Sequence, residues 1–313
     1  MTRPSQISAL VLCIGLFVSS IARTTESVDL LIEHATVFVG DGRTFTNASV
    51  AIIGNRIHWV GPTDKALFSA TTRIDGNEKT VIPGLIDGHV HLMSSTYVLD
   101  SLSLEAYQST ILPHWLEAML LHGVTTIRTL GAPIRESRYF KEKTATGELP
   151  GPRIIASGPG LTAPRGHPAA TMYTSTPEFS RRFVRTAETA DQARAAIAEV
   201  IDAGMESPLK LIYHGGDAGH DDYMMMGISI DRLATEALEA AVDEAHARGY
   251  IVSAHTNDYE DALTAVLIGV DGLEHGVVST ALPDERLSQA MIERGTFLVS
   301  TLRLQGLLHG SNV

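Results

Sequence analysis

The distribution of hydrophobic and polar residues changes near Pro83. Residues 23–82 hold short runs of β-branched and other apolar residues, separated by turn signals at 40–42 and 54–55. This pattern predicts a small all-β unit, which we interpret as the N-terminal part of a β-sandwich. Its expected strands are Leu30–Ile32, Ala35–Val39, Ser49–Ile53 and Ile57–Val60.

In residues 83–313 short apolar runs alternate with stretches that have apolar residues at helical spacing. Such alternation predicts βαβ units with a parallel sheet, and therefore an α/β fold. Seven strands are expected, at Leu85–His91, Thr125–Leu130, Arg153–Ser157, Leu209–Tyr213, Tyr250–His255, Gly272–His275 and Thr296–Ser300. Helices are expected at Gln108–His122, Ala190–Ala203, Asp231–Arg248, Asp258–Ile268 and Asp284–Arg294.

Residues 1–22 have the composition of an export signal. Arg3 is the only charge before Arg23, Ala9–Val18 is almost wholly apolar, and Ser20 and Ala22 supply small residues at a cleavage site. This order is typical of a cleaved signal peptide. The apolar run is shorter than the roughly 20 residues that a membrane-spanning helix needs. We therefore expect a periplasmic or secreted protein with no membrane anchor after cleavage.

Composition narrows the possible partners. The 313-residue chain has a formal net charge of -12 at pH 7. Nucleic acids and anionic membranes attract surfaces rich in Lys and Arg, so this charge argues against both as partners. Cys13 is the only cysteine and lies inside the predicted signal peptide, so the mature chain would have no disulfide.

The first strand after Pro83 ends in a His-x-His pair. On a strand, residues two apart point to the same face, so His89 and His91 would present their imidazoles side by side while Val90 points the other way. Paired imidazoles are suitable ligands for a divalent metal ion. Two histidines satisfied by hydrogen bonds near a strand end remain the alternative.

Three further side chains occur at the ends of later predicted strands. They are Lys210, His255 and His275. In a parallel βα barrel, residues at the carboxyl ends of the strands converge on one face. Lys210 lies between two leucines, and buried lysines are rare without a partner. Each residue alone has a structural explanation, but their shared position indicates a common site.

These segments together resemble the metal-dependent amidohydrolase superfamily, particularly its imidazolonepropionase-like and Xaa-Pro dipeptidase-like members. The resemblance covers most of the chain after the predicted signal. It implies a TIM-type (β/α)8 barrel beside a small β-sandwich. The residues that carry it are Pro83–His91, Gly123–Arg128, Leu209–Leu211, Ala254–His255 and Glu274–Gly276.

The resemblance also implies a site and a reaction. It implies two metal ions, commonly zinc, with His89 and His91 on one, His255 and His275 on the other, and an N-carboxylated Lys210 between them. A hydroxide between the metals would attack the carbonyl of an amide or other C–N bond. A dipeptide or an acyl-amino acid would be a fitting substrate.

One part of the family's pattern has no counterpart. The family places a catalytic aspartate at the end of strand eight, and this chain ends thirteen residues after its seventh predicted strand. We therefore expect a barrel truncated after about seven βα units, and we identify no catalytic acid or base. A degenerate chain with little catalysis stays open as an alternative. A mononuclear deaminase of the same superfamily is the other, and Lys210 argues against it.

Residues near the expected strand ends are candidates for contacting substrate. Arg165 and His167 lie in the loop after the third strand, and Tyr213 follows the lysine strand. Binding residues favour such loops. Arg128, on the second strand, is interpreted as a partner in an internal ion pair.

Overall fold

The computed structural model describes residues 25–93, 104–174, 177–215, 229–277 and 285–302. The predicted signal peptide lies outside these residues. The chain divides into two compact units, Met1–Pro83 and Gly84–Val313, so the division falls one residue after the predicted boundary. Among the described residues, no helix has the length and apolar composition to cross a membrane.

The first unit is a five-stranded sheet with the order β3-β2-β1-β4, in which β5 also pairs with β1. Strand β1 is antiparallel to β2 and parallel to β4. Its core is two small groups of aliphatic side chains around Val37 and Leu31. The strands are β1 (Glu26–Phe38), β2 (Thr44–Ile53), β3 (Arg56–Pro62), β4 (Phe68–Asp75) and β5 (Thr80–Val81), with a short 3-10 turn η1 (Thr63–Lys65).

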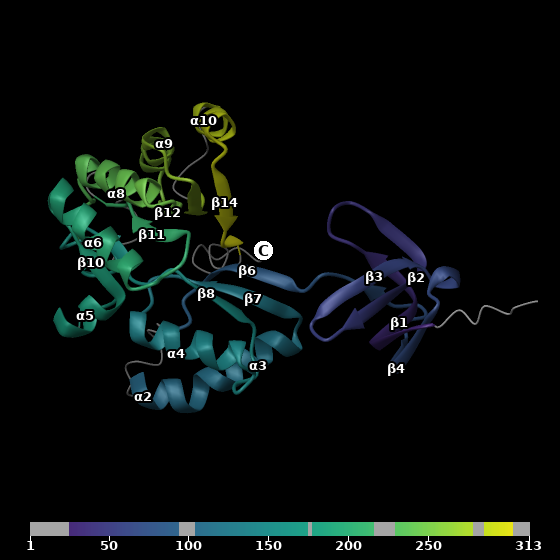
Figure 1. Cartoon of the computed structure of the whole chain (residues 1–313). Helices are drawn as coiled ribbons and strands as arrows, with labels where there is room; N and C mark the ends of the chain where they lie inside the picture. The colour runs from purple at the N-terminus through teal and green to yellow at the C-terminus, as the bar shows by residue number, and fades with distance from the viewer. Residues whose placement is uncertain (1–24, 94–103, 175–176, 216–228, 278–284, 303–313) are drawn as a thin grey trace, which may run out of the picture. The chain divides into compact units, whose positions relative to one another are not determined.

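The second unit alternates strands with helices, and all of its strand pairs are parallel (Figure 1). The strands lie in two sheets, of order β6-β7-β8 and β10-β9-β11-β12-β13-β14. They are β6 (Leu85–Val90), β7 (Val124–Thr129), β8 (Arg153–Ala156), β9 (Gly160–Thr162), β10 (Val184–Thr186), β11 (Leu209–Ile212), β12 (Val252–His255), β13 (Gly272–His275) and β14 (Phe297–Ser300).

Helices follow most of these strands. Helix α9 shows how their ends are fixed: the Asp258 carboxylate accepts a hydrogen bond from the Asp261 amide, and Gly269 ends the helix with a φ of 116°. The helices are α2 (Leu104–Ala106), η2 (Tyr107–Ile111), α3 (Leu112–Leu121), α4 (Ile134–Ala145), α5 (Pro177–Phe183), α6 (Ala190–Asp202), α8 (Thr235–Ala247), α9 (Tyr259–Ile268) and α10 (Arg286–Arg294).

The predicted α/β alternation is present, with some differences. All seven expected strands form, and their ends differ from the expected ones by at most two residues. Helix α8 begins at Thr235 rather than at Asp231, because the Asp231 amide donates to the Arg165 carbonyl instead of joining the helix. Helix α4 was not predicted, because its sequence is mostly polar and buries only Ser137 and Phe140.

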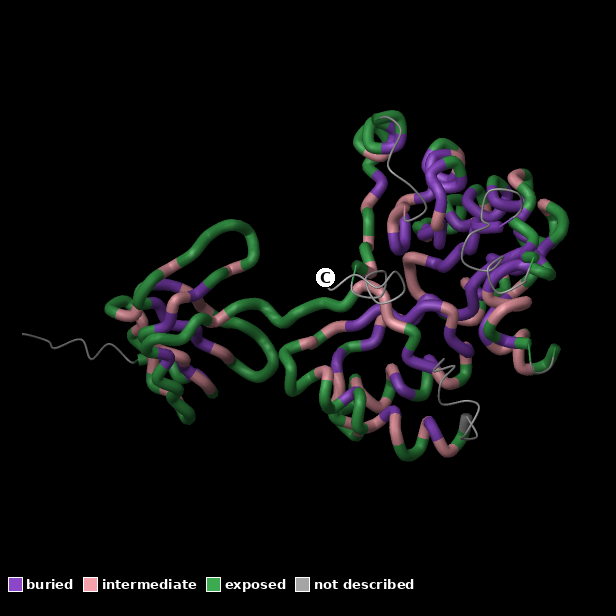
Figure 2. Tube along the Cα trace, turned by 180° about the vertical axis from the view of Figure 1, so that it is seen from behind, coloured by how far each residue is buried: buried purple, intermediate pink, exposed green. Residues whose placement is uncertain are grey.

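Burial divides the strands of the second unit into two kinds. Every residue of β11, β12 and β13 is buried, as expected for central parallel strands. Strands β6 and β14 lie at sheet edges and keep exposed positions, among them Ile86 and Leu298. Buried and exposed stretches alternate along the rest of the chain (Figure 2). Lys210, His255 and His275 thus lie on strands that are buried along their whole length.

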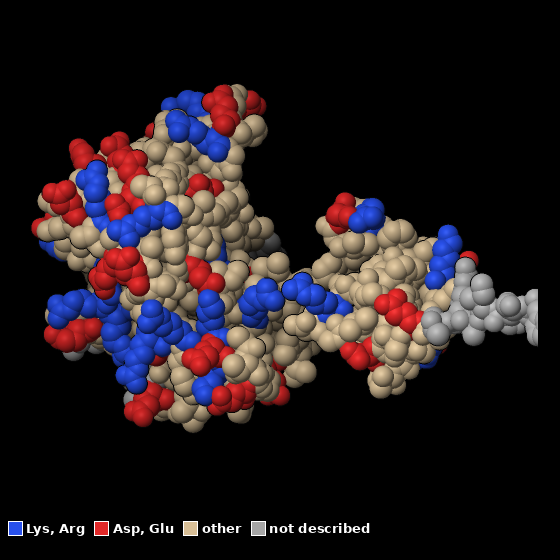
Figure 3. Space-filling model, in the orientation of Figure 1, with Lys and Arg blue, Asp and Glu red and all other residues tan. Residues whose placement is uncertain are grey.

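Charged side chains of both signs are interspersed on the face drawn in Figure 3. A group of arginines lies around α4, α5 and β10, and three of them form ion pairs: Arg181 with Glu178, Arg182 with Glu136, and Arg185 with Glu199. Much of this positive charge is therefore neutralised by nearby acids.

Candidate metal and active site

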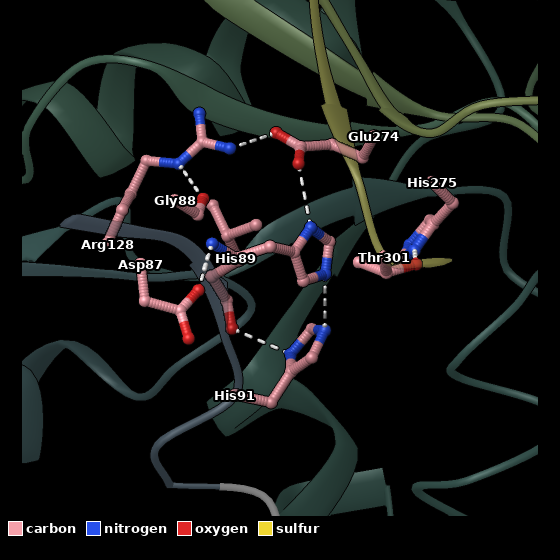
Figure 4. A network of polar contacts seen from close by, with 9 residues as sticks. Asp87, Gly88, His89, His91, Arg128, Glu274, His275 and Thr301 are labelled. Carbon is pink, nitrogen blue, oxygen red and sulfur yellow. Dashed lines mark hydrogen bonds and ion pairs between the residues drawn. The ribbon is translucent and has the colours of Figure 1, made fainter. Parts of the chain in front are cut away.

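Strand β6 brings His89 and His91 together. Their Nε2 atoms lie 3.2 Å apart (Figure 4). The Nδ1 of His89 donates to the Glu274 carboxylate at 2.7 Å, and the Nδ1 of His91 donates to the Leu130 carbonyl at 3.0 Å. Since each Nδ1 holds its proton, each neutral ring turns an Nε2 lone pair toward the other.

Both rings are kept neutral. Burial, followed by the charge of Lys210, lowers the pKa of His89 below its usual value. Packing of the ring among protein atoms, and then His89 and Lys210, lower the pKa of His91 to about 3. Part of His91 nevertheless opens on a cavity of about 960 Å³, which lies beside β6 and residues 298–302.

His275 and His255 extend the cluster. The His275 ring centroid lies 4.4 Å from that of His89 and 4.5 Å from that of His255. His275 exchanges a 2.8 Å hydrogen bond with the Thr301 hydroxyl through Nδ1. Its φ is 74°, a conformation that costs energy for a residue with a side chain and that tends to occur at functional sites. The Nε2 of His255 is buried with no hydrogen-bond partner among the described residues.

Lys210 on β11 is 3% exposed, and its Nζ has no hydrogen-bond partner among the described residues. Burial lowers the pKa of its amine to about 8, with Glu274 acting in the opposite direction and Arg128 in the same one. Its charge in turn lowers the pKa of His255 and His275, after the larger effect of burial. The amine therefore belongs to the same electrostatic cluster as the histidines.

Glu274, on β13, contacts the histidine cluster through His89. Its two oxygens accept from the His89 Nδ1 and from the Arg128 guanidinium, and the Arg128 Nε donates to the Gly88 carbonyl at 2.7 Å (Figure 4). Burial alone would raise the pKa of Glu274, but Lys210, the His89 hydrogen bond and Arg128 lower it to about 2. Each oxygen of the Glu274 carboxylate thus accepts a hydrogen bond, one from His89 and the other from Arg128.

The sequence analysis assigned part of this arrangement. Its interpretation of Arg128 as an internal ion-pair partner agrees with the contact to Glu274. It gave Glu274 no role. The sequence did contain one indication that Glu274 has a specific partner: it is a charged residue directly before His275, in a strand otherwise made of Gly, Leu and His.

The substrate candidates lie in different surroundings. The His167 ring centroid is 5.0 Å from that of His255, so this residue is part of the cluster. Tyr213 is almost wholly buried, with its hydroxyl 3.1 Å from that of Thr235. Arg165 is exposed, and its carbonyl holds the Asp231 amide. The structure therefore groups His167 with the four strand-end histidines and gives Tyr213 and Arg165 other contacts.

The sequence pattern of one family covers most of the second unit. The amidohydrolase family matches residues 80–310. This chain belongs to the amidohydrolase family. The resemblance that its strand-end motifs indicated is thereby confirmed.

Curated relatives share moderate identity with this amidohydrolase. The chain is 25% identical to the ochratoxinase of Aspergillus niger over 313 residues, which cover 93% of this chain and 62% of the relative. It is 30% identical to an uncharacterized protein of Mycobacterium bovis over 234 residues, which cover 74% of this chain and 53% of the relative. The chain thus spans less than two thirds of the length of these relatives.

A solved structure supports the fold. A prolidase complexed with N-methylphosphonate-L-proline is 28% identical, with a TM-score of 0.71. The match covers 87% of this chain and 66% of that chain.

Proposed function

We propose that the protein is a metal-dependent hydrolase that cleaves an amide or related C–N bond in a small dipeptide-like or acyl-amino-acid substrate. His89 and His91 would hold one divalent ion and His255 and His275 a second, with carboxylated Lys210 serving both. Zinc is the ion that such a donor set commonly takes. Membership of the amidohydrolase family supports this assignment.

The observation that carries the proposal is the 3.2 Å approach of the His89 and His91 Nε2 atoms. Both atoms carry a lone pair, because Nδ1 is the donor in each ring. Two lone pairs at this distance repel each other unless a positive centre attracts both. A cation removes the repulsion, and the buried Nε2 of His255 provides another donor atom without a partner. The residues therefore fit divalent ions.

Lys210 fits the same site after one chemical change. A charged amine has no lone pair with which to bind a metal. A neutral amine can add to carbon dioxide, forming an N–C bond and releasing one proton, which leaves an anionic carbamate. Because burial lowers the Lys210 pKa to about 8, a sizeable fraction of the amine is neutral near physiological pH. The carbamate would relieve the lack of a partner for the buried Nζ.

When bound, the ions would polarise the scissile carbonyl and acidify a water molecule. The protein's own groups prepare the site for them. Glu274 fixes the tautomer of His89, and Arg128 keeps Glu274 ionised and oriented. Thr301 holds the ring of His275. His167 lies beside His255 and is our candidate for orienting substrate, with Arg165 in the same loop as a candidate for a substrate carboxylate.

The proposal also includes the barrel architecture and the export of the protein. We infer that β6, β7, β8, β11, β12, β13 and β14 supply seven strands of a (β/α)8-type barrel, and that the first unit is part of a β-sandwich. Export directed by residues 1–22 would place the protein in the periplasm or outside the cell.

Metal content combined with a substrate panel tests the proposal. Zinc-loaded protein is desalted, its zinc is counted by mass spectrometry, and hydrolysis of Xaa-Pro dipeptides and N-acyl-amino acids is followed by chromatography. We expect about two ions at the histidine cluster, counted beyond any ion bound elsewhere in the chain. His255→Ala should lose the second ion, Lys210→Ala should lose at least one because the carbamate serves both, and both variants should lose turnover. His246→Ala, on the surface of α8, is the matched control.

The ion count separates the alternatives. One ion at the cluster would favour the mononuclear deaminase arrangement. No ion would contradict the proposal and favour a degenerate chain.

A further inference from the structure

A second group of ligating side chains lies outside the site just described. His214 follows β11, Asp258 caps the N-terminus of α9, and Asp261 lies in the first turn of that helix. One ligand atom from each residue lies within 4.8 Å of the others. All three residues are buried, with exposures of 3%, 7% and 0%. The His214 ring centroid is 5.7 Å from that of His255, so the two groups are neighbours that share no residue.

The hydrogen bonds of the two aspartates leave two oxygens unused. Asp258 Oδ1 accepts from the Asp261 amide at 2.8 Å, and Asp261 Oδ1 accepts from the Arg232 guanidinium. Asp258 Oδ2 and Asp261 Oδ2 are buried with no partner among the described residues. Burying a carboxylate oxygen without a partner is costly, so native proteins rarely leave one in this state.

The two acids also disfavour each other's charge. Burial, followed by the neighbouring Asp258, raises the pKa of Asp261 to about 7, although Arg232 contacts Asp261 and acts in the opposite direction. An additional positive species would satisfy both free oxygens and reduce the repulsion between the acids. A shared proton can join the two oxygens to each other, whereas a divalent ion can bind both oxygens together with a nearby imidazole nitrogen.

We propose that His214, Asp258 and Asp261 bind a divalent cation of the zinc type at a site separate from the histidine cluster. Two carboxylate oxygens and one imidazole nitrogen form a mixed donor set, which suits borderline first-row ions better than calcium or magnesium. The ion connects the segment after β11 to the start of α9. It thereby fixes the ends of the strands that carry Lys210 and His255.

The test counts zinc ions per chain in variants of the full protein. Asp258→Asn and Asp261→Asn each remove one anionic ligand, and Asn caps a helix as well as Asp, so the start of α9 is preserved in the first variant. Glu260→Gln is the matched control, because Glu260 is exposed in the same turn of α9. Protein is stripped with a chelator, loaded with zinc, and desalted before the count.

We expect each aspartate variant to retain one ion fewer than the wild type, while Glu260→Gln retains the same number. Zinc should also raise the melting temperature of the wild type more than that of the aspartate variants. Equal zinc counts in wild type and variants would overturn the proposal and leave a shared proton as the explanation. If an aspartate variant does not fold, His214→Gln provides the same comparison.

This test is independent of the proposed hydrolase site. A His89→Asn/His91→Asn variant removes ligands from the histidine cluster only. If the hydrolase proposal is wrong, that variant keeps the wild-type count while Asp258→Asn still loses one ion. If the present inference is wrong, the pattern is reversed.

Discussion

Glu274 is the residue on which the orientation of the His89 ring depends. Its carboxylate is completely buried and is shared between His89 and Arg128. Neither of these partners has a second carboxylate contact in the described part of the chain. The His89 ring and the buried Arg128 guanidinium are therefore both held by a single side chain.

We predict that Glu274→Gln lowers the free energy of unfolding by about 3–5 kcal/mol, because it leaves the buried charge of Arg128 without its counterion. Urea unfolding of the metal-free protein, followed by circular dichroism, measures the change. Glu178→Gln removes a carboxylate from an exposed ion pair with Arg181 and should cost less than about 1 kcal/mol. Equal effects of the two substitutions would refute the role given to Glu274.

The lowered pKa of Glu274 should make the stability of the fold depend on pH. The pKa of Glu274 is lowered from 4.5 to about 2 in the folded protein. A carboxyl with a lowered pKa contributes stability above its unfolded pKa and loses that contribution as the pH falls toward its folded value. Acid between about pH 4.5 and 2 should therefore destabilise the wild type more steeply than Glu274→Gln. Parallel stability curves over this interval would contradict the assignment.

If Lys210 must be carboxylated before metal binds, metal uptake should depend on pH and on bicarbonate. With a pKa of about 8, the neutral fraction of the Lys210 amine rises roughly 25-fold between about pH 6.5 and 8.5. Zinc uptake by stripped protein should then be faster at the higher pH, and faster with bicarbonate than without it. Carbon-13 NMR with labelled bicarbonate should show a carbamate signal that Lys210→Arg lacks. A signal of the same size in that variant would exclude Lys210 as its source.

The clustering of these side chains could be predicted from the sequence because candidate ligands follow simple positional rules. His89 and His91 are two apart, His255 and His275 end strands whose apolar runs are clear, and Lys210 lies within another such strand. Contacts made across strands do not leave such a local pattern. The pairing of Glu274 with Arg128 spans 146 positions of the sequence, so only the fold reveals it.

At the level of elements, β6 and β14 differ from the strands between them. Each lies at the edge of its sheet, and exposed apolar side chains such as Ile86, at 72%, and Leu298, at 51%, project from them. Edge strands with exposed apolar residues favour pairing with another chain. We therefore expect these two strands to be the part of the described residues through which copies of the chain would associate.

We predict that Ile86→Lys weakens self-association about tenfold or more, since burying an isoleucine contributes roughly 1.5–3 kcal/mol. Sedimentation velocity over a range of protein concentrations measures the change. Ile292→Lys is the matched control, because Ile292 is 81% exposed but lies on helix α10. An equal effect in both variants would attribute the association to general hydrophobicity and not to the strand edge.

Elements with a strong apolar period were predicted well, and those without one were not. Strand β13 has the expected bounds, and α9 differs by one residue at its start. Helix α4 and the three-residue strands β9 and β10 were missed, because short or mostly polar segments carry little periodic signal. The division of the strands into two sheets depends on register, which the sequence does not display.

On the scale of the whole molecule, the chain combines an all-β unit with an α/β unit that contains both groups of candidate ligands. The two groups lie near the ends of β6, β11, β12 and β13, where the carboxyl ends of parallel strands bring distant residues together. We therefore propose that the second unit binds the metal ions, and that the histidine cluster with Lys210 holds two of them.

Anomalous X-ray diffraction from zinc-loaded crystals, recorded at the zinc absorption edge, would locate these ions. We expect one peak within bonding distance of the His89 and His91 Nε2 atoms and a second near His255 and His275, with added density on the Lys210 Nζ between them. Fully loaded crystals with no peak at these histidines would contradict this proposal.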